Sequence, residues 1–320
     1  MRSITVLLLG CCMTLQGLCQ DSTLVLPTPA TESNSGKEEM QPTHIFQSPR
    51  LINANTVNLI QKGILEFKVT HNFGDAAGDF GGLKNFFGLD DAQDIRIGFQ
   101  YGISKHLNVA FARYKGSFQV QRIYELGLKW LMMQQRDNDP SHPLSMALYV
   151  NAAVATMKSG TNPNQENFQK GFSERLSNLY QLMIARKFGP LSLQLNPSLV
   201  HRNFALPYDQ KTLFAMGGAA RIHLGGRYSL LFDYFHTFRN QSSKDSFAVR
   251  NVNFYDVFGV GFEILTGGHV FTLNFTNTQD ILENRFIPRT VKAWEKGQFR
   301  WGFSVSREFD MGWKNRSRKK

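Results

Sequence analysis

The chain has 320 residues, of which 42% are hydrophobic and 12% aromatic, and its formal net charge is +11. A mean hydropathy of −0.28 is too polar for a bundle of membrane helices, and no stretch after residue 20 reaches the roughly 18 consecutive apolar residues of a membrane helix. The basic residues are scattered except for a final cluster of Lys314, Arg316, Arg318, Lys319 and Lys320. We therefore expect no nucleic-acid partner.

Residues 1–20 have the pattern of a secretory signal peptide. Arg2 supplies the positive end, residues 4–13 the apolar stretch, and residues 17–19 a small-residue cleavage region. A lipoprotein signal ending at Cys11 is the alternative, although its apolar stretch is short. The cysteines of the chain all lie in this segment: Cys11, Cys12 and Cys19. We therefore expect an exported protein whose mature part has neither disulfide nor thiol chemistry.

Residues 21–55 are rich in Thr, Ser, Pro and Glu and carry few apolar side chains. Such a composition cannot support a packed core, so it predicts a disordered periplasmic leader. From Gly63 onward, apolar and polar side chains alternate in segments of about ten residues, the spacing of a strand with two different faces. We expect a barrel domain over residues 56–310, followed by a basic C-terminal tail at 311–320.

The alternation is clearest in residues 94–102, where Ile95, Ile97 and Phe99 would face one side of a sheet. Counting such segments predicts strands at 64–71, 94–102, 107–115, 118–131, 144–156, 175–187, 190–200, 213–224, 228–238, 252–264, 269–277 and 298–309. Their number is even, as in single-chain bacterial outer-membrane barrels. The predicted fold is all-β: a transmembrane antiparallel up-and-down β-barrel of about twelve strands.

The connections between these strands alternate between short and long, apart from a tight turn at 115–117 on the long side. Outer-membrane barrels have this asymmetry, with short periplasmic turns and longer external loops. The strands of a soluble barrel also alternate, but their polar side chains face water and tend to be Lys, Glu and Thr. The corresponding row of this chain's predicted strands is largely Gly, Ser, Ala, Asn and Gln. We therefore expect the outer membrane of a Gram-negative bacterium, with lipid around the barrel.

The loop between residues 72 and 93 combines many glycines with several phenylalanines. Glycines at this density allow tight turns against packed rings, so the loop either folds into the pore or contacts a ligand, or it forms a structured cap. Its aspartates could bind Ca²⁺, but their spacing fits no EF-hand loop, and we expect no metal site. The candidate loop residues are His71, Gly74, Phe86, Phe87 and Asp90.

Charged and polar residues of the inward row are the candidate lumen residues: Arg96, Glu125, Lys129, Arg221, His223, Asp233, Glu263 and Arg300. An unpaired buried charge is costly, so opposed charges must pair across the interior or contact water. A twelve-stranded barrel is only modestly wider than an eight-stranded barrel, which side chains fill. These residues therefore form either a selectivity-setting constriction or a salt-bridged plug.

Several short motifs are shared with a known family. They are Gly63-Ile64-Leu65-Glu66-Phe67, His71-Asn72-Phe73-Gly74, Phe86-Phe87-Gly88-Leu89-Asp90, Ile95-Arg96-Ile97-Gly98 and Glu283-Asn284-Arg285-Phe286-Ile287-Pro288. From about residue 52 to Phe309 the chain resembles a Bacteroidota family of outer-membrane β-barrels known as a domain of unknown function. Asn72 departs from the family's usual His-Arg-Phe-Gly. The resemblance implies a barrel and a location, and little about activity.

The expected function is a non-enzymatic outer-membrane barrel, acting as a small channel or as a binding and scaffold component for an exported partner. No predicted strand carries a Ser and a His two residues apart, the arrangement that a membrane-embedded lipase could use. We expect no catalytic residue and no cofactor, and a small solute or a periplasmic or exported protein as partner. The alternatives are a lipase-like membrane hydrolase and a soluble periplasmic barrel that binds a small ligand.

Overall fold

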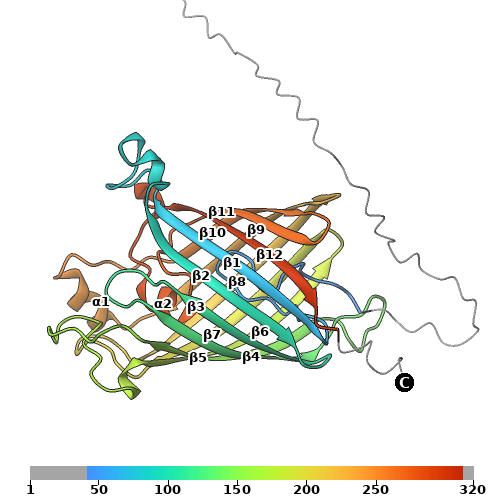
Figure 1. Ribbon diagram of the computed structural model, residues 1–320, viewed down its shortest axis with the longest axis horizontal. Coiled ribbons are helices and arrows are strands. Elements are labelled where there is room, and N and C mark those ends of the chain that lie inside the picture. Colours follow the sequence, from blue (N-terminus) through green and yellow to red (C-terminus); the bar gives the residue numbers. More distant parts are fainter. Residues whose placement is uncertain (1–41, 313–320) are drawn as a thin grey trace, which may run out of the picture. The chain divides into compact units, whose positions relative to one another are not determined.

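The computed structural model describes residues 42–312. Twelve antiparallel strands form one closed barrel, in which neighbours in sequence are paired and β12 pairs back to β1 (Figure 1). The strands are β1 (Ile64–Asp75), β2 (Ala92–Gly102), β3 (Leu107–Tyr114), β4 (Ile123–Met133), β5 (Ser145–Ala155), β6 (Leu176–Phe188), β7 (Leu191–Arg202), β8 (Thr212–Gly225), β9 (Tyr228–Phe238), β10 (Val257–Leu265), β11 (His269–Thr276) and β12 (Arg300–Asp310). The predicted fold class and strand number are confirmed.

Strand β4 shows why these sequences form a barrel wall. Tyr124, Leu126 and Leu128 alternate with Glu125 and Lys129, and their burial alternates in step. Leu126 is 58% exposed, whereas Glu125 is 1% exposed. A soluble barrel would have the opposite polarity, with apolar side chains inside. An apolar outer face and a polar inner face are typical of a barrel surrounded by lipid.

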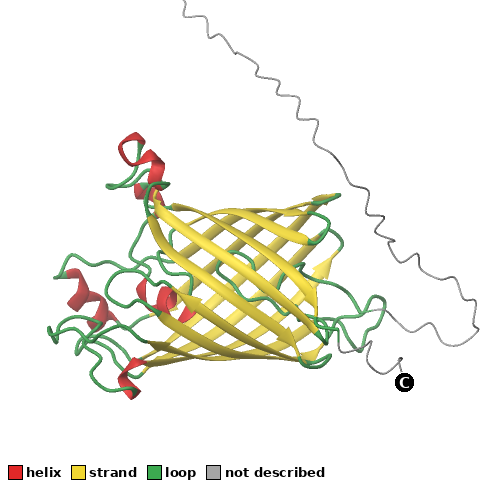
Figure 2. Ribbon diagram, in the orientation of Figure 1, coloured by secondary structure: helices red, strands yellow, loops and turns green. Residues whose placement is uncertain are grey.

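The two ends of the barrel differ in their connections. The short-turn end carries the connections 103–106, 134–144, 189–190, 226–227 and 266–268, and the long-loop end carries 76–91, 115–122, 156–175, 203–211, 239–256 and 277–299. The long loops contain the 3-10 helices η1 (Leu83–Gly88), η2 (Ser173–Arg175) and η3 (Trp294–Lys296) and the α-helices α1 (Gln241–Ala248) and α2 (Glu283–Arg289). Figure 2 shows the helices gathered at this end. Among the helices of the described residues, none has the length and apolar character to cross a membrane.

Two strands begin five residues later than the alternation predicts. β4 begins at Ile123 rather than at 118, and β10 begins at Val257 rather than at 252. Phe118 and Arg122 have φ angles of 52° and 56°, which a strand does not accommodate. The expected tight turn at 115–117 is consequently an eight-residue loop, 115–122. Before β10, the Tyr255 N–H donates to the Thr290 carbonyl (2.9 Å) rather than to a neighbouring strand.

Residues 42–62, here called the re-entrant segment, enter and leave the barrel at the short-turn end. Pro42 forms a bridge with Arg136, and Lys62 forms one with Gly102. Between them the chain runs into the lumen and turns back; Figure 1 shows it in blue within the wall. The expected disordered leader extended to residue 55, and this is wrong for residues 42–55. The predicted signal peptide and most of the predicted basic tail lie outside the described residues.

The apolar core of the molecule lies inside the barrel. Ile45, Phe46, Leu51 and Ile52 of the re-entrant segment belong to one cluster of buried apolar side chains. Ala54 and Val57 of the same segment belong to it too, and the remaining members come from the wall, from Leu131 on β4 round to Val257 on β10, and from Phe286 and Ile287 of α2. The barrel is therefore filled by two pieces of its own chain, whose apolar burial stabilises them in the lumen.

Candidate functional site in the barrel lumen

Asp233 of β9 holds the tip of the re-entrant segment. The Leu51 N–H donates to the Ala54 carbonyl (2.9 Å) and closes a tight turn. The main-chain N–H groups of Asn53 and Ala54 donate to Asp233 Oδ2 at 2.6 and 3.0 Å, and Asn53 Nδ2 donates to Asp233 Oδ1 at 2.8 Å. Three donors satisfy this buried carboxylate. Asp233 therefore recognises a backbone turn.

Two lysines on other strands bind carbonyl groups of the same segment. Lys129 Nζ of β4 donates to the carbonyls of Pro49 and Thr56 at 3.0 and 2.9 Å. Lys68 Nζ of β1 donates to the Arg50 carbonyl at 2.7 Å. Because β1, β4 and β9 are spread around the wall, a segment that contacts all three lies across the middle of the lumen.

Amide side chains of β7 bind the returning arm of the segment. Gln194 Oε1 accepts the Val57 N–H (2.8 Å), and Gln194 Nε2 donates to the Asn55 carbonyl (2.7 Å). Asn196 Nδ2 also donates to the Asn55 carbonyl, at 3.0 Å. These bonds satisfy main-chain groups that would otherwise be buried without partners.

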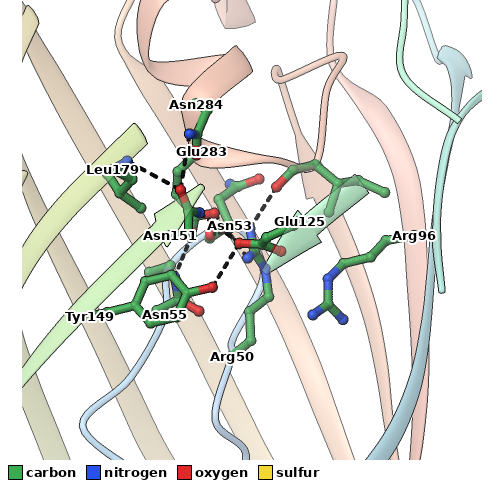
Figure 3. A network of polar contacts seen from close by, with 12 residues as sticks. Arg50, Asn53, Asn55, Arg96, Glu125, Tyr149, Asn151, Leu179, Glu283 and Asn284 are labelled. Atoms are coloured by element: carbon green, nitrogen blue, oxygen red, sulfur yellow. Dashed lines mark hydrogen bonds and ion pairs between the residues drawn. The ribbon is translucent and has the colours of Figure 1, made fainter. Parts of the chain in front are cut away.

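The loop 277–299 fills the lumen from the long-loop end and meets the re-entrant segment at Glu283. Glu283 Oε2 accepts from Arg50 Nη1 (3.0 Å), and Oε1 accepts from Asn55 Nδ2 (2.8 Å) (Figure 3). Arg50 Nη2 also donates to the Ile281 carbonyl at 2.6 Å. Residues from opposite ends of the barrel thus form one buried contact.

Glu125 of β4 is the centre of a second cluster, on the wall beside this contact. Its Oε2 accepts from the Tyr114 hydroxyl (2.5 Å), and its Oε1 accepts from the Tyr149 hydroxyl (2.7 Å) and from Asn151 Nδ2 (2.6 Å). Arg96 Nε donates to the Tyr114 hydroxyl at 3.0 Å and so places a cation close to the carboxylate. Figure 3 shows Arg96, Glu125 and Tyr149 next to Arg50 and Glu283.

At the long-loop end, ion pairs tie the lumen loop to other loops. Arg285 Nη2 and Arg289 Nη1 donate to Glu166 of the loop 156–175 at 3.1 and 2.6 Å. Burial alone would raise the pKa of Glu166, but Arg285, Arg289 and the nearby Arg202 outweigh it and lower this pKa from 4.5 to about 2. The loop 277–299 is therefore locked to the loop 156–175 while Glu166 is ionised.

The eight predicted lumen residues occupy the inner row of the wall. Seven of them are buried there: Arg96, Glu125, Lys129, Arg221, Asp233, Glu263 and Arg300. The eighth, His223, is half-buried near the short-turn end of β8. They are not gathered in one ring, because Arg221 pairs with Glu263 (2.8 Å) and Arg300 pairs with Asp75 (2.7 Å), while Lys129 and Asp233 bind the re-entrant segment.

The five predicted loop residues do not enter the lumen. His71 lies within β1, because that strand continues to Asp75, and its ring stacks on Phe303 with centroids 5.7 Å apart. Gly74, at the end of β1, and Asp90 line a cavity of about 470 Å³ at the long-loop end. Phe86 and Phe87 are exposed on η1. The alternative in which this loop folds into the pore is wrong, since residues 42–62 and 277–299 occupy that space.

Ser104 and His106 have the two-residue spacing sought for a lipase, but they lie in the short turn 103–106, where the His106 N–H donates to Ser104 Oγ (3.2 Å). Within residues 42–312, no group of three or more His, Cys, Asp or Glu side chains could hold a metal ion.

Three central residues of this site were not predicted from the sequence: Arg50, Asn53 and Glu283. A signal for the first two was present, since residues 45–57 leave the Ser-, Thr-, Pro- and Glu-rich composition and carry several large apolar side chains. Glu283 lies in a quoted family motif, although nothing in that motif indicates that its loop folds inward.

The family comparison matches residues 46–309 of the chain to the family described as membrane bound beta barrel domain (DUF5777). The chain belongs to this family. The match begins inside the re-entrant segment, so the DUF5777 domain includes most of the filled lumen as well as the wall. The family expected from the sequence was a barrel of unknown function, and this is confirmed at that level.

The solved structures to which this DUF5777 chain is similar share little sequence with it. An outer membrane channel from Pseudomonas putida F1 is 11% identical, with 82% of this chain and 100% of that chain covered and a TM-score of 0.47. The KdgM porin is 9% identical, with 77% and 99% covered and a TM-score of 0.44. LpxR from Salmonella typhimurium is 12% identical, with 77% and 99% covered and a TM-score of 0.34. No curated protein matches the chain.

Proposed function

We propose that the chain is an outer-membrane barrel closed by its own residues, which acts without catalysis as a binding or scaffold component through its long loops. The observation that carries this proposal is the contact between the re-entrant segment and the loop 277–299. Arg50 and Glu283 meet there at 3.0 Å, and both side chains are almost fully buried. A barrel filled from both ends in this way is suited to display and binding rather than to free diffusion of solutes.

The rim of the long-loop end also supports a binding role. Asp209 of the loop 203–211 pairs with Arg202 (2.9 Å) and with Arg239, and Arg239 Nη2 donates to the Pro288 carbonyl (2.7 Å). Three loops are thereby cross-linked by charge-assisted hydrogen bonds. A surface that is ordered before a partner arrives loses less conformational freedom on binding.

A gated channel is the second candidate, and the wall chemistry favours it over a permanently sealed barrel. Lys68, Lys129 and Asp233 bind main-chain atoms of the re-entrant segment. Water could replace those atoms without leaving a buried charge unsatisfied, whereas an apolar lining could not exchange its contacts in this way. Withdrawal of the segment would therefore leave a polar passage.

Planar-bilayer recording tests the proposal. We expect the full chain to give no discrete current steps, and a variant lacking residues 43–60 to give them, because the deletion removes one of the two fillers. The full-length Asp233→Ala variant keeps the segment but loses the three bonds at its tip, and we expect brief openings. Stable current steps from the full chain would contradict closure and support an open channel. If no variant gives current steps although each shows the gel shift of a folded barrel, the gated channel is excluded and the scaffold function remains.

A further inference from the structure

The tip of the loop 76–91 presents an unusual amount of exposed apolar surface. Residues 80–89, here called the loop tip, read FGGLKNFFGL and carry one charged side chain, Lys84. Their large apolar side chains are exposed: Phe80, Leu83, Phe86, Phe87 and Leu89. Contiguous exposed apolar side chains mark interaction sites in folded proteins.

Backbone hydrogen bonds hold the base of the loop tip, and its apolar side chains stay on the surface. The Gly82 N–H donates to the Ala76 carbonyl (2.9 Å), and the Ala76 N–H donates to the Phe299 carbonyl next to β12 (2.7 Å). At Gly88, where φ is +82°, an added Cβ would lie 2.5 Å from the carbonyl oxygens of Gly74 and Asp75. These contacts hold the base of the tip against the ends of β1 and β12.

The backbone of the tip is in a conformation that side-chain-bearing residues rarely adopt. Phe86 and Phe87 have φ angles of 44° and 54°, in the left-handed region. Such conformations persist only where surrounding structure imposes them, and they occur preferentially at functional sites. Here the strained pair places two aromatic rings on the surface.

The position of the tip indicates what covers it. Figures 1 and 2 show η1 outside the outline of the barrel at the long-loop end, whereas α1 lies beyond the ends of the strands. The adjoining surface is aromatic: His71 and Phe303 stack on the outer face of the wall, and Trp294 stacks on Phe299 in the loop 277–299, with centroids 4.7 Å apart. Aromatic side chains at this level form the interface girdle of a membrane barrel.

We propose that the loop tip inserts into the lipid leaflet at the long-loop end of the barrel. Its apolar side chains continue the lipid-facing surface past the ends of β1 and β2, into the boundary between headgroups and acyl chains. The cation Lys84 suits the same location, because its stem lies along apolar surface while its ammonium group reaches lipid phosphates. The tip thereby anchors one sector of the rim.

Spin-label accessibility tests this insertion with a matched control in the same chain. Leu83 on the tip and Val249 beside α1 are both 83% exposed and both lie at the long-loop end. With Cys11, Cys12 and Cys19 replaced by serine, single Leu83→Cys and Val249→Cys variants are labelled and reconstituted in phosphatidylcholine vesicles. Collisions with oxygen, which concentrates in lipid, are compared with collisions with a water-soluble nickel complex.

We expect oxygen collisions to dominate at position 83 and nickel collisions to dominate at position 249. Phe80→Cys provides a second position on the tip, with the same expectation. Nickel accessibility at both tip positions equal to that at 249 would overturn the proposal. So would protection from both reagents that increases with protein density in the vesicles, because that result would assign the tip to a second copy of the chain.

Discussion

At the scale of single residues, the lumen is organised by charges that bind main-chain atoms as well as each other. Glu283 is fully buried, and its carboxylate accepts one hydrogen bond from the cation Arg50 and one from the amide of Asn55. Replacing a buried ion pair by neutral groups is often tolerated, whereas removing one partner leaves an uncompensated charge. The pair therefore has a clear signature in variants.

Neutralising Glu283 alone is expected to destabilise the barrel more than neutralising both members of the pair. Glu283→Gln leaves the Arg50 cation buried without its carboxylate, and Arg50→Met leaves the carboxylate, each at a cost of about 3–5 kcal/mol. The double variant is expected to lose clearly less than the sum. Urea unfolding in detergent, followed by the gel shift of the folded barrel, measures this cycle. Additive losses would show that the two groups do not interact.

The Glu166 contact is expected to depend on pH. Its folded pKa of about 2 lies below the ordinary value of 4.5, so its contribution is fully present above pH 4.5 and is lost as pH falls toward 2. At about 1.4 kcal/mol per pKa unit, this shift corresponds to about 3 kcal/mol. Pepsin is active across this window and would cleave the loops 156–175 and 277–299 increasingly toward its acid end.

Glu166→Gln is the matched variant for this pH effect. It cannot ionise, so its loops are expected to be cleaved to a similar extent throughout the window. Equal pH profiles for the two proteins would show that Glu166 does not lock the loops.

At the scale of elements, the two faces of the wall tolerate different changes. An added Cβ at Gly127 of β4 would lie 2.4 Å from the Tyr149 hydroxyl, on the lumen side. At Gly218 of β8, which helps line the lipid-facing surface, the nearest atom would be 3.9 Å away. The inner face is close-packed and the outer face is open to lipid.

Gly127→Ala is therefore expected to cost about 1–3 kcal/mol, because it displaces Tyr149 from Glu125. Gly218→Ala, the same substitution on the outer face, is expected to be nearly neutral. The midpoint of urea unfolding compares them directly. An equal effect of the two substitutions would contradict the assignment of faces.

The strands could be predicted from sequence because each carries its own two-residue period, which needs no knowledge of the neighbours. The starts of β4 and β10 could not be predicted correctly. Apolar loop residues such as Phe118 follow the same two-residue period, and their left-handed backbone is seen only in the structure. The inner row was predictable by the same parity. The partners of Lys129 and Asp233 were not, because they are main-chain atoms that no side-chain pattern encodes.

At the scale of the whole molecule, the central feature is a barrel that uses its own chain as core. Composition favoured disorder for residues 42–55 because a segment this short cannot form a core from its own apolar side chains. Inside the barrel these residues need no core of their own, because the wall supplies both apolar contacts and hydrogen bonds. A segment of this kind is visible only when the closed sheet around it is known.

The most direct test of this account is whether the re-entrant segment lies against β9 in the membrane. An Asn53→Cys/Asp233→Cys variant without the native cysteines replaces two side chains that touch at 2.8 Å. Oxidation in membranes is expected to join them, so that fragments from cleavage between positions 53 and 233 stay linked until reduction. An Asn53→Cys/Val249→Cys control should remain unlinked. Absence of the link in the first variant, with position 53 open to a membrane-impermeant thiol reagent, would contradict the filled lumen.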